Sequence, residues 1–244
     1  MEKSFELLSL WRLVRDPDYA SWSKERGVRR CQIKVFGMED TNDYFHGRKG
    51  AHHDLIVATD RLIDSEVVPR WQVYLNKLGI KELHEVLALA DELNLWDRVQ
   101  DLGETLNIHA MTFDSAGNGF ANHHLRLTAG DEQFIPSLLW EKTKNHFGDD
   151  CRLFTEAELV ASIMDEGEGV CPMPKDHNLV FFLTSDWNVY PNFSEVAPWW
   201  KLGNLKTDPW GESLARYESS RPLGLRVMTT STHRELHPSD DEDY

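Results

Sequence analysis

Three strand-like segments recur in the first half of the chain at a nearly constant step, and this repeat restricts the fold more than any other feature. Corresponding points along the segments lie 39 and 37 residues apart, and the residues between them have the apolar spacing of amphipathic helices. Strands that alternate with helices at this spacing predict a parallel sheet with right-handed crossovers. The segments are Gln32–Phe36, Arg70–Leu75 and Leu106–Met111.

Each of these segments alternates apolar with polar residues, as Ile33 and Val35 alternate with Gln32 and Lys34. A doubly wound sheet buries both faces of its strands and would show continuous apolar runs instead. We therefore predict an α/β fold with a partial TIM-like parallel barrel, whose apolar face packs on helices and whose polar face lines a cavity. A sheet with one exposed edge or face is the alternative.

Further elements are expected on both sides of this pattern. Residues 1–15 are apolar enough to pack against another part of the fold, and residues 116–130 have the composition of a loop. We divide the chain into the barrel-like region 1–150, a smaller region 151–236 and an acidic disordered tail 237–244. The other expected elements are helices over 16–26, 133–146, 155–166 and 208–218, a buried strand over 179–183, and a turn and short strand over 186–191.

The charge and cysteine content restrict where such a chain works and what it binds. A formal net charge of −15 disfavours nucleic acid and anionic membranes as partners. The sequence has no apolar run long enough to span a bilayer and no signal-peptide pattern at its start. Cys31, Cys151 and Cys171 are odd in number and far apart, which predicts reduced thiols and a cytoplasmic location.

Two stretches of the sequence resemble a known family. The strand ending at Phe36–Glu39, the loop and helix start at Asp43–Ala51, and the strand after Val67–Pro69 resemble the middle of the radical S-adenosylmethionine (radical SAM) barrel. Phe182–Asn192 and Leu202–Lys206 resemble the family's C-terminal SPASM extension, which reads Gly-x-Val-Tyr-Pro-Cys and then Leu-Gly-Asn-Ile. The resemblance implies a partial barrel with a small SPASM-like extension, and it implies S-adenosylmethionine and a [4Fe–4S] cluster as cofactors.

The sequence departs from the family at the residues that hold the cluster. The Cys-x3-Cys-x2-Cys motif is absent, and so is the Gly-Gly-Glu strand that contacts the methionyl amine. Asn192 stands where the SPASM extension has a cysteine. The three cysteines have no cluster-like spacing. We therefore expect no metal ligands in this chain, so the cofactors are implied by the resemblance alone.

The polar strand faces supply the candidate site residues. By the resemblance, Lys34 falls where the family has Ser or Thr facing S-adenosylmethionine, and the strand with Arg70, Gln72 and Tyr74 reaches the ribose and the substrate. These four are our cofactor-binding candidates. For Arg70, Gln72 and Tyr74 the competing explanation is ordinary strand alternation at a solvated edge. For Lys34 it is a side chain that extends to solvent at the barrel mouth. The substrate-binding candidates are Asn76, Asn107 and His109.

Other polar motifs have weaker functional interpretations. Arg48 and Gly50 precede a predicted helix whose N–H groups could hold an anion, but a solvated loop before a helix is the favoured explanation. The pairs His52-His53 and His123-His124 lack the spacing of metal ligands, since adjacent side chains point apart. The sequence contains no P-loop, dinucleotide fingerprint or nucleophile elbow.

Two functional hypotheses follow. In the first, the chain is the C-terminal portion of a radical SAM enzyme, truncated here, and a missing N-terminal segment completes the barrel and holds the cluster. In the second, the chain is a stand-alone, non-catalytic degenerate barrel that binds either a partner subunit completing the barrel or a small molecule. The first predicts a cluster motif encoded upstream; the second predicts a folded protein that takes up no iron.

Overall fold

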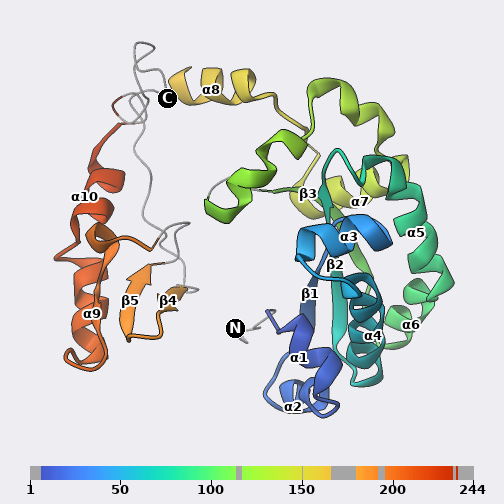
Figure 1. Ribbon diagram of the computed structural model, residues 1–244, viewed down its shortest axis with the longest axis horizontal. Helices are drawn as coiled ribbons and strands as arrows, with labels where there is room; N and C mark the ends of the chain where they lie inside the picture. The colour runs from blue at the N-terminus through green and yellow to red at the C-terminus, as the bar shows by residue number, and fades with distance from the viewer. Residues whose placement is uncertain are drawn as a thin grey trace. The chain divides into compact units, whose positions relative to one another are not determined.

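The chain divides into two compact units, Met1–Leu153 and Phe154–Tyr244, in the computed structural model shown in Figure 1. The structure describes residues 7–113, 117–149, 151–165, 180–191, 196–232 and 235. The acidic tail expected at 237–244, together with Cys171 and Asn192, lies outside the described residues. The two units are described separately below.

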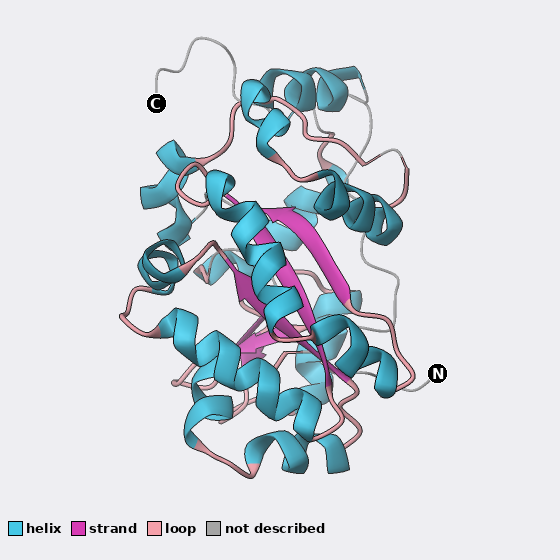
Figure 2. Ribbon diagram, turned by 90° about the vertical axis from the view of Figure 1, so that its right-hand side faces the viewer, coloured by secondary structure: helices cyan, strands magenta, loops and turns pink. Residues whose placement is uncertain are grey.

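A parallel three-stranded sheet in the order β1-β2-β3 organises the first unit. Helices connect its strands, as the constant step in the sequence predicted, and Figure 2 shows helices lying over the sheet. The elements of this βαβαβ segment are β1 (Arg30–Val35), α3 (Glu39–His46), α4 (Ala51–Asp64), β2 (Val68–Leu75), η1 (Ile80–Glu82), α5 (Leu83–Glu92), α6 (Leu95–Asp101) and β3 (Asn107–Thr112). The mixed α/β class is confirmed; a closed TIM barrel is not present among the described residues.

The apolar face of this sheet forms the main core. Trp71 in the central strand is fully buried, and its indole Nε1 donates to Thr59 Oγ1 of α4 at 3.2 Å. This partner matters because a buried indole N–H without an acceptor is costly. The strand residues that face the core are Cys31, Ile33, Val35, Trp71, Val73, Leu75, Ile108 and Ala110.

Two short helices precede the sheet, α1 (Leu10–Arg15) and α2 (Tyr19–Glu25). Both pack on α4, and Leu8, Leu10, Leu13 and Val14 lie in or against the core, as expected for this segment; residues 1–6 lie outside the described residues. Arg61 of α4 donates from Nη1 to the carbonyls of Leu13 and Val14, both at 2.7 Å, and thereby satisfies acceptors at the end of α1.

The segment after β3 is more helical than the sequence predicted. Residues 116–130, expected as a loop, contain the 3₁₀ helix η2 (Gly117–Leu125) and the start of η3 (Ala129–Phe134). Helix α7 (Ser137–Phe147) begins four residues later than expected, because Pro136 fixes an extended backbone in front of it. α7 packs along β3.

The second unit contains a small antiparallel sheet in the order β4-β5-β6. Strand β4 was expected to be buried, but Phe182 and Leu183 are exposed, and of its three residues Phe181 alone packs against the small core of this unit. Helix α10 was not predicted. The elements are α8 (Glu156–Asp165), β4 (Phe181–Leu183), β5 (Asn188–Pro191), η4 (Pro198–Trp200), β6 (Gly203–Asn204), α9 (Trp210–Glu218) and α10 (Leu223–Thr230).

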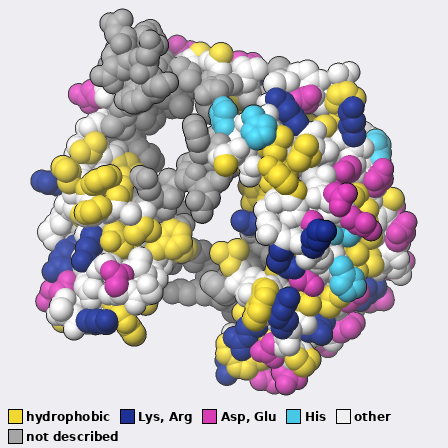
Figure 3. All heavy atoms as spheres, in the orientation of Figure 1, with side chains coloured by type: hydrophobic (Ala, Val, Ile, Leu, Met, Phe, Trp, Pro, Cys, Tyr) yellow, Lys and Arg dark blue, Asp and Glu magenta, His cyan; other side chains and the backbone are white. Residues whose placement is uncertain are grey.

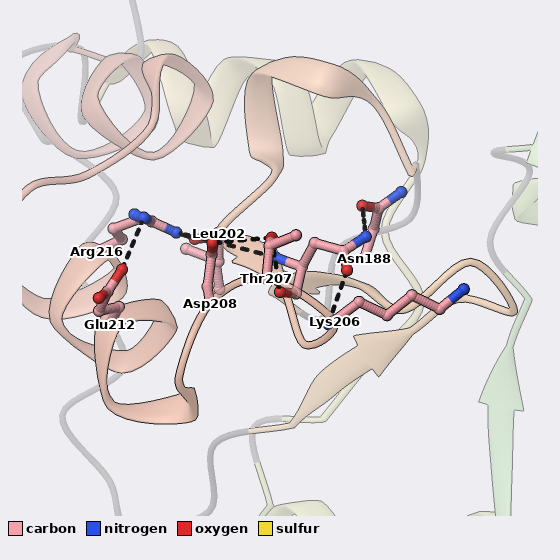
Figure 4. A network of polar contacts seen from close by, with 8 residues as sticks. Asn188, Leu202, Lys206, Thr207, Asp208, Glu212 and Arg216 are labelled. Carbon is pink, nitrogen blue, oxygen red and sulfur yellow. Dashed lines mark hydrogen bonds and ion pairs between the residues drawn. The ribbon is translucent and has the colours of Figure 1, made fainter.

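An arginine-centred polar network joins β6 to α9 in this unit (Figure 4). Arg216 Nη1 lies 2.6 Å from Asp208 Oδ2 and donates to the carbonyl of Leu202 at 2.8 Å. Asn204 Nδ2 donates to Asn188 Oδ1 at 2.8 Å, which ties the β6 turn to β5. A Cβ on Gly203 would lie 2.5 Å from Ser213 Oγ, so the close approach of α9 requires glycine there. The Leu-Gly-Asn segment therefore has a structural role.

Candidate functional site

The polar face of the β1-β2-β3 sheet is the candidate site. Strand register places its side chains in adjacent rows: Gln32 pairs with Arg70 and Asn107, and Lys34 pairs with Gln72 and His109. Tyr74 follows in the next row of β2. Six of the seven predicted site residues therefore share one face, which the register alone establishes. The seventh, Asn76, lies beyond the end of β2.

In the row nearest the amino ends of the strands, Arg70 Nη2 donates to Gln32 Oε1 at 3.0 Å. Asn107 extends the row on β3 and contacts His146 and His109. The row therefore combines a guanidinium with two amides, a set of donors suited to an anionic or polar ligand.

The middle row contains the second cation of the face. Lys34 is exposed, whereas Gln72 is buried and accepts from Tyr74 OH at 3.4 Å. The Lys34 ammonium lies 5.7 Å from the centroid of the Tyr74 ring. Partial burial raises the pKa of Tyr74, so its hydroxyl stays protonated and can donate at neutral pH.

An aromatic cluster, which the sequence analysis did not identify, lies at the carboxyl ends of β1 and β2. The Phe36 ring stacks on Tyr74 and on Phe45 with centroid distances of 5.0 and 4.8 Å. His46 contacts the edge of Phe36, and burial is the main reason that its pKa is lowered. Cations and amides thus give way to aromatic rings from the amino to the carboxyl ends of the strands.

His109 is fully buried and contacts α7. Its ring stacks on His146 with a centroid distance of 3.9 Å, and Asn107 Oδ1 lies 2.7 Å from its Nδ1. Burial, followed by the charges of His146 and Arg70, lowers the pKa of His109 to about 4. His109 is therefore neutral at physiological pH, and its buried Nε2 has no hydrogen-bond partner among the described residues. His146 was missed because only the packing of α7 brings it to β3.

Asn76 holds the loops at the carboxyl ends of β1 and β2 together. Its Nδ2 donates to the carbonyls of Phe36 and Tyr74, and its Oδ1 accepts from the amides of Leu78 and Gly79. The amide is buried and engaged on both sides in this conformation. The neighbouring Lys77 is exposed, and its Nζ donates to the carbonyl of His124.

The start of α4 is occupied by a side chain of the protein itself. Asp43 accepts from the amides of Gly50 and His52 at 2.6 and 2.9 Å. Burial acts to raise the pKa of Asp43, but these backbone donors outweigh it and lower the pKa overall. Arg48 lies 2.6 Å from Asp54. An anion from solution would therefore have to displace the Asp43 carboxylate.

The described residues do not provide a set of metal ligands. No group of three or more His, Cys, Asp or Glu side chains in this part of the chain is arranged to hold a metal ion. Cys31 is buried on the apolar face of the sheet, opposite the candidate site, and Cys151 is partly buried near the end of the first unit. No helix among the described residues is long and apolar enough to cross a membrane.

Comparison with known proteins identifies relatives of this fold. No protein-family model and no curated protein matches the sequence. Among solved structures, anSMEcpe, a radical SAM anaerobic sulfatase maturase with bound AdoMet (S-adenosylmethionine), matches with a TM-score of 0.51 and 14% identity, over 89% of this chain and 57% of that one. The fold of this chain is therefore similar to part of that AdoMet-bound protein.

Two further structures of the same relative agree. The form with bound AdoMet and the Cp18Cys peptide matches with a TM-score of 0.51 and 13% identity. A polyhistidine-tagged form with AdoMet matches with a TM-score of 0.51 and 14% identity. They cover 89% of this chain, and 57% and 54% of those chains. At this identity the likeness is one of fold, and this chain spans little more than half the length of its structural relative.

Figure 3 shows acidic and basic side chains interspersed over the face of the first unit in view. Several basic residues pair locally, as Arg98 does with Asp60 at 2.7 Å and Arg30 with Glu104 at 2.7 Å. Such exposed pairs contribute little to stability. On the polar face, by contrast, Arg70 donates to the Gln32 amide and Lys34 lies over the Tyr74 ring.

Proposed function

We propose that this chain is the C-terminal portion of a radical SAM-type protein, comprising part of a TIM-like barrel and a SPASM-like extension, and that the polar face of its sheet contributes to AdoMet binding. The observation that carries the proposal is the shared face of Lys34, Arg70, Gln72 and Tyr74, on a fold similar to that of an AdoMet-bound protein. AdoMet, cleaved reductively at a cluster in such proteins, would supply a radical that abstracts hydrogen from substrate.

The residues of the polar face fit AdoMet chemically. Lys34 and Arg70 supply positive charge for the carboxylate, in a chain whose overall charge is −15. Gln72 and Tyr74 supply a neutral acceptor and donors for hydroxyl or amino groups. The buried His109 Nε2 is an acceptor still in need of a donor, which a bound ligand can provide. We propose that His109 and Asn107 contact the substrate, and that Asn76 fixes the loops at the edge of the substrate site.

An iron–sulfur cluster does not fit the described residues. Such clusters need several converging thiolates, whereas Cys31 faces the core and Cys151 has no second described cysteine beside it. We derive no step through a cluster in this chain. In the first hypothesis, the cluster belongs to a further N-terminal segment that also completes the barrel.

The second hypothesis, a non-catalytic barrel-like protein that binds a partner or small molecule, is favoured by this lack of thiolates. The intact mass of the protein isolated from its native cells separates the two. A mass well above 28.2 kDa favours the radical SAM enzyme; a mass of 28.2 kDa favours the non-catalytic protein.

Binding of AdoMet to the purified chain tests the proposed site. We expect saturable binding by isothermal titration calorimetry, and a loss of about tenfold in affinity for Lys34→Ala, because a charge-assisted contact of about 1.4 kcal/mol is removed. Lys34→Arg should retain most of the affinity. The matched control is His84→Gln on the exposed side of α5, which should bind as the wild type does.

Two results would contradict the proposed site. One is the absence of AdoMet binding by the folded chain. The other is equal affinity of Lys34→Ala, Lys34→Arg and the wild type, which would place binding elsewhere. Anaerobic reconstitution with iron and sulfide should leave the chain without a cluster, and stoichiometric cluster uptake would overturn our assignment of the cysteines.

A further inference from the structure

Helix α7 covers the free edge of β3. Among the described residues β3 pairs only with β2, so backbone groups on its other side need partners. The Ala110 amide donates to Thr143 Oγ1 of α7 at 2.8 Å, and this buried hydroxyl donates in turn to the Leu139 carbonyl at 2.7 Å. Protection of the Ala110 amide from exchange therefore reports whether α7 is docked.

The last turn of α7 is held by two imidazoles and one amide. The rings of His109 and His146 stack at 3.9 Å with an interplanar angle of 16°. Asn107 bridges them, with Oδ1 at 2.7 Å from His109 Nδ1 and Nδ2 at 3.1 Å from His146 Nδ1. The amide faces one imidazole with its acceptor oxygen and the other with its donor nitrogen, so both hydrogen bonds form only when one Nδ1 carries hydrogen and the other does not.

Protonation opposes this arrangement from either side. A proton on Nδ1 of His146 would leave two donors, this N–H and the Asn107 Nδ2–H, facing each other with no acceptor between them. A proton on His109 places a charge in a fully buried position, beside Arg70 of β2 and the neutral Gln72. Lys142, earlier on α7, lies over the Trp96 ring at 5.2 Å instead. The electrostatic influences on His109 from its surroundings, Arg70 and His146, both disfavour its protonated form.

We propose that His109, Asn107 and His146 form a proton-sensitive latch that holds the last turn of α7 against β3 and releases it in acid. The pH window follows from the sign of the shift. Because the pKa of His109 is about 4 when folded and 6.5 when exposed, the open form binds more protons between these values. The latch is therefore stable above pH 6.5 and weakens as the pH falls toward 4.

Hydrogen exchange of the full chain tests the latch. From about pH 7 to about pH 5 we expect the protection factor of the Ala110 amide to fall about tenfold or more relative to that of the core amide of Val73. In Asn107→Asp, a carboxylate accepts from Nδ1–H of both imidazoles, so protection should be retained or rise over the same range. The control His84→Gln should follow the wild type.

Constant Ala110 protection in the wild type, or an Asn107→Asp variant with the wild-type pH dependence, would overturn the latch. A second measurement uses the wild type alone, so it tests the latch even if the Asn107→Asp variant fails to fold. Nitrogen-15 NMR of the wild type at neutral pH should find hydrogen on Nδ1 of one histidine of the pair and on Nε2 of the other. The same tautomer at both residues would also overturn the proposal.

Discussion

The two faces of the β1-β2-β3 sheet are built by alternate residues of the same strands, yet their side chains have different partners. On one face, Trp71, Val73 and Ile108 are packed among helices and are at most 1% exposed. On the other, Gln72 and Arg70 contact amides and rings, and Lys34 reaches solvent. Changes on the first face should act on folding, and changes on the second should act on binding.

The largest expected effect is on the apolar face. Trp71→Ala should lower the free energy of unfolding by about 3–5 kcal/mol, because it leaves a large cavity and removes the partner of Thr59. Chemical denaturation measures this loss. Its neighbour in sequence, Gln72→Ala, should cost about 1 kcal/mol or less but weaken AdoMet binding. Equal destabilisation by both variants would remove the distinction between the faces.

A smaller effect is expected where the two faces end. Asn76→Ala should cost about 2 kcal/mol, because four backbone groups of the β1 and β2 loops lose their side-chain partners and water recovers only part of that loss. The adjacent exposed Lys77→Ala is the matched control and should change the free energy of unfolding by about 0.5 kcal/mol or less. Thermal denaturation of both variants makes the comparison. An Asn76→Ala variant as stable as the wild type would contradict the role of Asn76 in holding the two loops together.

Local pattern was enough to predict the sheet and the membership of its polar face. Periodicity located all three strands to within two residues, and parallel register then brought Lys34, Gln72 and His109 into one row. The same alternation predicts nothing about which helix approaches an edge. Asn107 and His146 lie 39 residues apart, so their contact depends on where α7 docks.

The second unit was harder to predict for a related reason. Its strands have only two to four residues, so a short apolar run gave no indication whether β4 lies inside the sheet or at its edge. The roles of Gly203 and Arg216 come from the approach of α9 to β6, a contact between segments that local sequence does not specify. The capping of α8 is local by contrast: the Thr155 amide donates to Glu158 Oε2 at 2.8 Å, and the Glu158 amide donates to Thr155 Oγ1 at 3.1 Å.

Shift mapping by NMR during AdoMet titration tests the central claim most directly, because side-chain N–H signals report separately on the two faces. We predict that the side-chain amides of Gln72 and Asn107 shift on titration while the buried indole of Trp71 stays unchanged. No shift at Gln72 and Asn107, or shifts confined to the second unit, would contradict the assignment of the polar face as the ligand site.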